Sequence, residues 1–201
     1  MKMIVVYWFL WIYWVIVTFL MEKGKKRNNI ACFMLLLITC SSFNLRWFGI
    51  TVNLSVIFLF IVSNILLVLA RRKLFLFLAC LFIAHAYAAL QLWDITNPVW
   101  VFAPKIIIFS LILAFLVLFI TSNMVERFII ACTSIIIGEI VYSLVVYRLE
   151  WDVTIGDTFM FLLLCSLTCT ILLYHFFLEI KIKLQDILHM LEQQNKRWTN
   201  E

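Results

Sequence analysis

Three ionisable residues lie inside long apolar stretches of this sequence, and they are its strongest candidates for chemistry. Lys105 and Glu139 lie in neighbouring stretches, predicted over 99–121 and 128–147, and His85 lies in the stretch before them. A charged side chain near the centre of a bilayer costs about 2.5–3.5 kcal/mol on insertion scales, so it normally has a partner or a function there. Because two successive spans run antiparallel, the helical rise places Lys105 and Glu139 at one depth, roughly 10–12 Å from the same face. We therefore predict that Lys105 and Glu139 form an ion pair.

His85 falls at the same depth, roughly 12 Å from that face by the same count. A layer of His85, Lys105 and Glu139 would hold groups whose charges can change, which is what a relay for protons or cations needs. The alternative is structural: Lys105 and Glu139 neutralise each other and hold two helices in register, with His85 hydrogen-bonded nearby. Breaking such a buried pair is strongly destabilising, so both residues would be needed for stability even without any transport. The sequence leaves these two interpretations open.

The composition predicts the elements that must position these residues. The chain of 201 residues is 66% hydrophobic and 13% charged, with a mean hydropathy of +1.09, whereas soluble domains are about 45–50% apolar. Apolar runs long enough to cross about 30 Å of hydrocarbon recur along it, and no hydrophilic block is large enough for a soluble domain. We predict an all-α, polytopic transmembrane helix bundle of about seven spans over 1–180, followed by a helical tail over 181–201.

The predicted spans alternate with polar connections that set the orientation. They lie at roughly 3–21, 28–44, 50–70, 74–93, 99–121, 128–147 and 158–180. The first is too long for a signal-peptide core and no small-residue cleavage site follows it, so we expect it to be retained. The second is close to the minimum length for a span. With the N-terminus outside, twelve of the sixteen Lys and Arg residues fall on the cytoplasmic side, which predicts an N-out, C-in protein of the cell membrane.

Small residues recur at helical spacing in two of the predicted spans. Cys80, Ala84 and Ala88 form one ridge, and Ser134 with Gly138 forms another. Small residues four apart let transmembrane helices approach closely. We expect these two spans to pack tightly at the ridges.

Several classes of function lack their motifs. The six cysteines, at 32, 40, 80, 132, 165 and 169, all fall in apolar segments and none has C-x-x-C spacing, so we expect packing roles rather than a metal site or disulfide. There is no Walker loop, H-E-x-x-H or G-x-S-x-G motif, which indicates a protein that is not an enzyme and has no cofactor. The formal charge of +5 is spread over segment ends rather than gathered on one face, so nucleic acid is not an expected partner.

The tail over 181–201 is predicted to be amphipathic. Its apolar residues Leu184, Ile187, Leu188 and Leu191 recur at i, i+3, i+4 and i+7, the spacing of one helix face. Such a face lies on the lipid surface or docks a partner protein, and both alternatives stay open here. The expected partners are thus the lipid bilayer and a membrane or cytosolic protein reached through the tail.

The opening YWFLWIYWVIVTFLMEK, the basic residues after it, the length and the seven predicted spans together resemble the YphA-like proteins. These are small multi-pass membrane proteins of unassigned function in Bacillus and its relatives. The resemblance implies a bacterial plasma membrane and assigns no functional residue. Two hypotheses remain: a non-enzymatic scaffold or accessory subunit, and a small transporter or proton- or ion-coupled carrier that uses His85, Lys105 and Glu139.

Overall fold

Seven helices make up most of the chain that the computed structural model describes, which covers residues 2–47, 50–96, 104–149 and 154–198. They are α1 (Lys2–Leu20), α2 (Lys25–Cys40), α3 (Leu54–Leu69), α4 (Lys73–Thr96), α5 (Lys105–Ile120), α6 (Met124–Arg148) and α7 (Thr158–Trp198). The prediction of an all-α chain is confirmed. The part of the predicted fifth span at 99–103 lies outside the described residues.

Three of these helices are long and apolar enough to cross a membrane: α4, α6 and the Thr158–Gln185 part of α7. The described parts of α1, α3 and α5 are apolar but shorter. A helix of 16 residues, such as α3 or α5, rises about 24 Å, which is less than the roughly 30 Å hydrocarbon core. Length and composition thus support three spans directly, fewer than the seven predicted.

A small three-stranded sheet lies at one end of the helices, in a region where we predicted no strands. Strands β1 (Asn44–Trp47) and β2 (Ile50–Asn53) form an antiparallel hairpin, and β3 (Thr154–Ile155) pairs parallel with β2. The prediction that a span starts near residue 50 is therefore wrong, because 50–53 belong to β2 and the helix starts at Leu54. The sheet ties the connection between α2 and α3 to the connection between α6 and α7.

Asn53 shows why the hairpin ends and α3 begins at this point. Its side-chain oxygen accepts a hydrogen bond from the Ser55 backbone N–H at 3.0 Å, which caps the helix. Its amide nitrogen donates to the carbonyl oxygen of Ser41 at 3.0 Å and to Asn44 Oδ1 at 2.9 Å. One buried side chain thus joins the end of α2, the first strand and the start of α3.

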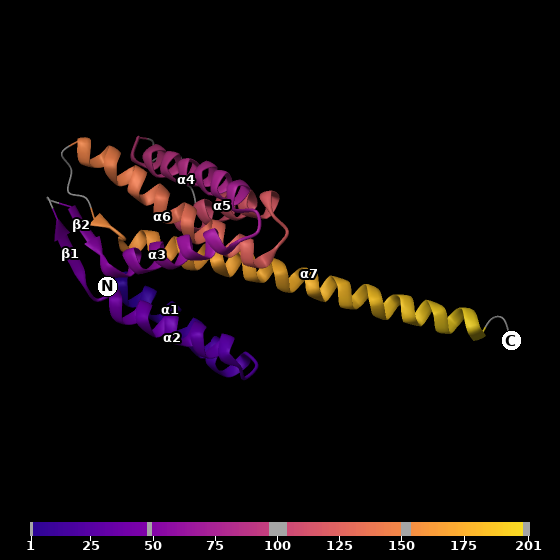
Figure 1. Ribbon diagram of the computed structural model, residues 1–201. Coiled ribbons are helices and arrows are strands. Elements are labelled where there is room, and N and C mark those ends of the chain that lie inside the picture. Colours follow the sequence, from indigo (N-terminus) through magenta and orange to yellow (C-terminus); the bar gives the residue numbers. More distant parts are fainter. Residues whose placement is uncertain (1, 48–49, 97–103, 150–153, 199–201) are drawn as a thin grey trace.

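The helices lie side by side, with α4, α5 and α6 on one flank, α1 and α2 on the other, and α3 and α7 between them (Figure 1). Helix α7 continues beyond the bundle as one unbroken helix, so no break separates the predicted tail from the predicted span (Figure 1). The tail is helical as predicted, up to Trp198. The side chains of Ile187, Leu188 and Leu191 lie outside the described residues.

The tightest packing is between α4 and α6, at the small residues that the sequence singled out. Cys80, Ala84, Ala88 and Ser134 are all buried. A Cβ atom added to Gly138 would lie 2.7 Å from the Ala84 carbonyl oxygen and 2.7 Å from Tyr87 Cδ1. The two backbones approach so closely because position 138 carries no side chain. The prediction of close approach at these ridges is confirmed.

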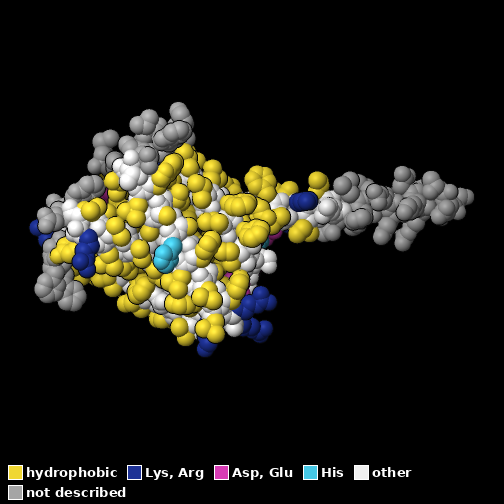
Figure 2. All heavy atoms as spheres, turned by 90° about the horizontal axis from the view of Figure 1, so that it is seen from above, with side chains coloured by type: hydrophobic (Ala, Val, Ile, Leu, Met, Phe, Trp, Pro, Cys, Tyr) yellow, Lys and Arg dark blue, Asp and Glu magenta, His cyan; other side chains and the backbone are white. Residues whose placement is uncertain are grey.

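The outside of the bundle is strongly apolar. Figure 2 shows hydrophobic side chains over most of the visible face, with Lys and Arg side chains near its ends. Large side chains such as Phe82, Phe115 and Phe119 are exposed on it. An apolar surface of this extent on hydrogen-bonded helices is suited to contact with lipid.

Candidate functional site

The carboxyl group of Glu139 is enclosed between α4 and α6 and forms the centre of the candidate site. The residue is 3% exposed. The Tyr87 hydroxyl donates a hydrogen bond to Glu139 Oε2 at 2.5 Å, and Gln91 Nε2 donates to the Tyr87 oxygen at 2.9 Å. Tyr87 and Gln91 are four residues apart on α4, so both point at the same place on α6. The result is a buried chain of hydrogen bonds that ends on a carboxyl group.

The loop before α7 closes the site toward the sheet. The Gly156 backbone N–H is directed at the Glu139 carboxyl group, and the Asp157 carboxylate lies near enough to act on it electrostatically. Gly156 has a φ of +84°, which glycine adopts readily and other residues rarely. One turn along α6, the buried hydroxyl of Ser143 has no hydrogen-bond partner among the described residues. The site therefore holds a carboxyl group, a phenol, an amide and a free hydroxyl.

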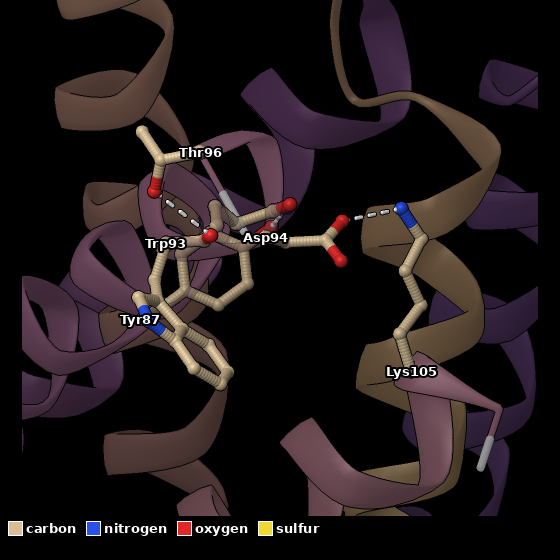
Figure 3. Close-up of polar contacts among 6 residues, drawn as sticks. Tyr87, Trp93, Asp94, Thr96 and Lys105 are labelled. Atoms are coloured by element: carbon tan, nitrogen blue, oxygen red, sulfur yellow. Dashed lines mark hydrogen bonds and ion pairs between the residues drawn. The ribbon is translucent and has the colours of Figure 1, made fainter. Parts of the chain in front are cut away.

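Lys105 has a different partner from the one predicted. Its Nζ lies 2.7 Å from Asp94 Oδ2, and Figure 3 shows the two side chains pointing toward each other from α5 and α4. The Lys105 side chain is 48% exposed and that of Asp94 15% exposed. Its ammonium also lies 5.0 Å from the centre of the Phe159 ring. The prediction of an ion pair between Lys105 and Glu139 is wrong in this structure.

The start of α5 explains the difference. The predicted span began near residue 99, which would place Lys105 almost two turns inside it, but the helix begins at Lys105 itself. The predicted fourth span, 74–93, ends just before Asp94, whereas α4 continues through Asp94 to Thr96. Lys105 and Asp94 thus meet at the ends of two consecutive helices. Asp94 lies seven residues further along α4 than Tyr87, the residue that binds Glu139.

His85 lies on the outward face of α4. Its side chain is exposed, and its Nδ1 lies 2.7 Å from the carbonyl oxygen of Leu81, one turn earlier on the same helix. It follows directly after buried Ala84, and one residue is a rotation of about 100° around the helix. The structure does not bring His85, Lys105 and Glu139 together, and of the three only Glu139 is buried.

The comparison with known proteins agrees with the apolar helical architecture. A model of the YphA-like integral membrane protein family matches residues 2–197. The chain belongs to this family. It is similar to a protein of Bacillus subtilis (strain 168) that bears the name "Uncharacterized protein YphA", with 25% identity over 161 residues, which is 80% of each chain. No solved structure matches.

Membership in the YphA-like family confirms the resemblance predicted from the first helix and the layout, and it extends that resemblance to almost the whole chain. It also makes the chain an integral membrane protein, as the apolar helices indicate. It assigns no substrate, partner or reaction to any residue.

Sequence reasoning missed the partners of Glu139 in this YphA-like chain, although a signal was present. Tyr87, Gln91 and Asp94 lie at i, i+4 and i+7 on α4, which makes one polar stripe on a mainly apolar helix. This polar stripe could have indicated the face of α4 that meets Glu139. Gly156 gave no such signal, because its approach to α6 depends on how the loop folds.

The site has no evident place for a metal ion. Within the part of the chain that the structure describes, no three His, Cys, Asp or Glu side chains are grouped closely enough to hold one. The six cysteines carry free thiols, and all of them except Cys32 are buried or half-buried. What the arrangement offers chemically is one enclosed carboxyl group that accepts a hydrogen bond from the Tyr87 hydroxyl.

Proposed function

We propose that this YphA-like protein is a non-enzymatic scaffold or accessory subunit of the bacterial cell membrane. The observation that carries the proposal is the enclosure of Glu139, whose carboxyl group accepts a hydrogen bond from Tyr87 at a close helix contact. A carrier needs its coupling group to reach water or substrate from at least one side. A carboxyl group that is 3% exposed and hydrogen-bonded in a packed interface instead fits a helix-locking role.

We further propose that all seven helices cross the membrane, with the N-terminus outside. The basic clusters at 23–27, 71–73 and 181–183 support this orientation, because positive residues concentrate in cytoplasmic connections. Strand β2 at the opposite end runs directly into the short helix α3, so a 16-residue helix need not match the bilayer alone. Modest mismatch is absorbed by local thinning of the bilayer and by flanking residues.

Labelling of single cysteines in intact cells tests the orientation, in a variant whose six native cysteines are replaced by serine. We choose Arg46→Cys in β1 and Ser122→Cys between α5 and α6, both at exposed positions at opposite ends of the bundle. A membrane-impermeant maleimide should label Cys at 46 in intact cells and Cys at 122 only after lysis. Labelling of position 122 in intact cells would reverse the orientation, and equal labelling of both positions would contradict seven alternating crossings.

A carrier is the second candidate, and one observation favours it. The Ser143 hydroxyl is buried beside Glu139 without a partner among the described residues, and together they resemble a place where a proton or small polar ligand could be held. Proton flux into proteoliposomes with an entrapped pH-sensitive dye distinguishes a carrier from a scaffold. The scaffold proposal expects wild-type protein to conduct no more protons than empty vesicles under an imposed potential. Flux that Glu139→Gln abolishes, in a variant that stays folded, would overturn it.

The scaffold proposal also needs a surface that meets a partner, and we place it on the projecting part of α7. Leu184 is 57% exposed there, beyond the packed bundle. A photoreactive amino acid at position 184 should give a protein adduct of defined mass in native membranes. The matched control is position 173 on the same helix, 58% exposed and near the middle of the candidate span rather than at its end, which should contact lipid only. Lipid adducts alone from both positions would contradict a partner at the tail.

A further inference from the structure

A polar cavity of about 360 Å³ lies at the end of the bundle opposite the sheet. It is formed where the connection between α3 and α4 meets the connection between α5 and α6. Its lining residues come from both connections and from the helix ends beside them: Arg71, Arg72, Phe75, Ile120, Thr121, Ser122, Asn123 and Glu126. A volume of this size is at the lower end of the range for small-molecule sites, large enough for a phosphate headgroup.

The cavity carries excess positive charge. Arg71 and Arg72 both line it, and neither forms an ion pair with any described residue. The acid in the lining, Glu126, has its Oε2 occupied by a hydrogen bond from the Thr121 hydroxyl at 2.7 Å. Lys73 follows the two arginines directly. Two unpaired guanidinium groups in one cavity are suited to bind a phosphate, because each offers several donors in a planar fork.

A buried arginine holds the opposite wall in place. Arg127 is 5% exposed, and its Nε donates to the carbonyl oxygen of Thr121 at 2.8 Å. Its guanidinium group also lies 5.4 Å from the centre of the Tyr174 ring on α7. Asn123 is held in place as the N-cap of α6, since its Oδ1 accepts a hydrogen bond from the Val125 backbone N–H at 3.1 Å. These hydrogen bonds hold the Thr121–Asn123 segment of the cavity wall in a defined conformation.

The cavity opens next to the apolar exterior. Phe75 belongs to its lining and is exposed, and Phe119, just before the lining residue Ile120, is 83% exposed. Figure 2 shows Lys and Arg side chains gathered beside hydrophobic ones near the end from which the projecting helix leaves. A ligand with an anionic head and apolar chains would satisfy both surfaces at once, whereas a free anion would use only one.

We propose that this cavity binds the headgroup of an anionic phospholipid, with the phosphate on Arg71 and Arg72 and the acyl chains along α4 and α5. Basic pockets between transmembrane helices at the cytoplasmic boundary are known to hold such headgroups. The cavity lies at the start of α6, whereas Glu139 lies further along that helix, toward the sheet. The proposed lipid site does not depend on the role of Glu139. The inference therefore goes beyond the proposed function.

The test is a lipid titration of the purified full-length protein in a non-ionic detergent. Thermal unfolding is followed while phosphatidylglycerol, phosphatidylcholine or inorganic phosphate is added. We expect phosphatidylglycerol to stabilise the wild type and phosphatidylcholine to have little effect. We expect each arginine in direct contact with the phosphate to contribute about fivefold in affinity, so Arg71→Gln with Arg72→Gln should weaken apparent binding by roughly 25–30-fold.

The matched control is Lys25→Gln with Lys26→Gln, which removes two exposed charges at the same predicted side of the membrane but outside the cavity. It should change phosphatidylglycerol binding less than about twofold. An equal loss in both double variants would overturn the proposal in favour of general surface charge. Stabilisation by inorganic phosphate as strong as that by phosphatidylglycerol would overturn it in favour of a free-anion site.

A second measurement tests the lipid preference of the cavity if the variant with both arginines replaced by glutamine does not fold. Native mass spectrometry of the wild type, purified with a mixture of the two lipids, should show one retained phosphatidylglycerol in preference to phosphatidylcholine. The charge-conserving pair Arg71→Lys with Arg72→Lys should keep that preference. Equal retention of both lipids by the wild type would overturn the proposal.

Discussion

Replacement of Gly138 tests whether α4 and α6 approach as closely as the structure shows. The nearest atoms to a Cβ at this position would be the Ala84 carbonyl oxygen and Tyr87 Cδ1, each at 2.7 Å, and ordinary contact begins at 3.4 Å. One of these atoms belongs to the α4 backbone, which cannot move without the helix. An alanine therefore has to push the helices apart by several tenths of an ångström, and a valine by more.

The magnitude follows from two opposing effects. Overpacking of a tight core costs about 1–3 kcal/mol. Replacing a glycine within a helix by alanine returns about 1 kcal/mol, because alanine has the higher helix propensity. For Gly138→Ala we expect a net loss of about 1 kcal/mol, and for Gly138→Val about 3 kcal/mol, since valine adds volume and little propensity. For a chain of this length, 1 kcal/mol corresponds to about 2–4 °C in Tm.

The assay is thermal unfolding of the purified protein in detergent, in parallel with its level in the membrane. The control is Gly24→Ala, because a Cβ at Gly24 would have no atom within 4 Å. We expect Tm to fall in the order wild type, Gly138→Ala, Gly138→Val, with Gly24→Ala close to the wild type. A rise in Tm for Gly138→Ala would refute the reasoning, because the gain in helix propensity would then exceed any clash with α4.

Three further predictions follow from the polar contacts. Tyr87→Phe should lower the free energy of unfolding by about 1–3 kcal/mol in thermal unfolding, because Glu139 loses a buried donor. Lys105→Met should cost only about 0–1 kcal/mol, and a double-mutant cycle with Asp94→Asn should give a coupling below about 1 kcal/mol, because the lysine is half exposed. Gly156→Ala should lower stability by about 1–3 kcal/mol, since its φ of +84° strains other residues.

Controls and contrary results separate these outcomes. Tyr142→Phe removes a half-buried hydroxyl that forms no hydrogen bond with any residue the structure describes, and it should change Tm little. Equal effects of Tyr87→Phe and Tyr142→Phe would contradict the role of the bond to the buried carboxyl group. A loss of 3–5 kcal/mol for Lys105→Met, the size expected for a broken buried pair, would contradict its exposed position at the end of α5.

Much of the architecture could be predicted from the sequence, because hydropathy and helical spacing are local properties. The apolar runs predicted helices, the small residues at 84, 88 and 138 predicted where two of them meet, and the first helix predicted the family. These inferences held because a backbone in lipid must satisfy its own hydrogen bonds, which leaves few alternatives to a helix. Even the start of α5 had a local signal in Pro104, since proline is common at the first turn of a helix.

The partners of the charged residues were decided only by the tertiary structure. Counting residues gives the depth of Lys105, Glu139 and His85, but depth does not determine the direction in which a side chain points around its helix. That direction follows from which faces pack together: Gly138 brings α6 against α4, which turns Glu139 toward Tyr87 and leaves His85 outside. Long-range contacts of this kind also formed the sheet and the cavity, because each joins segments that are distant in the chain and adjacent only after folding.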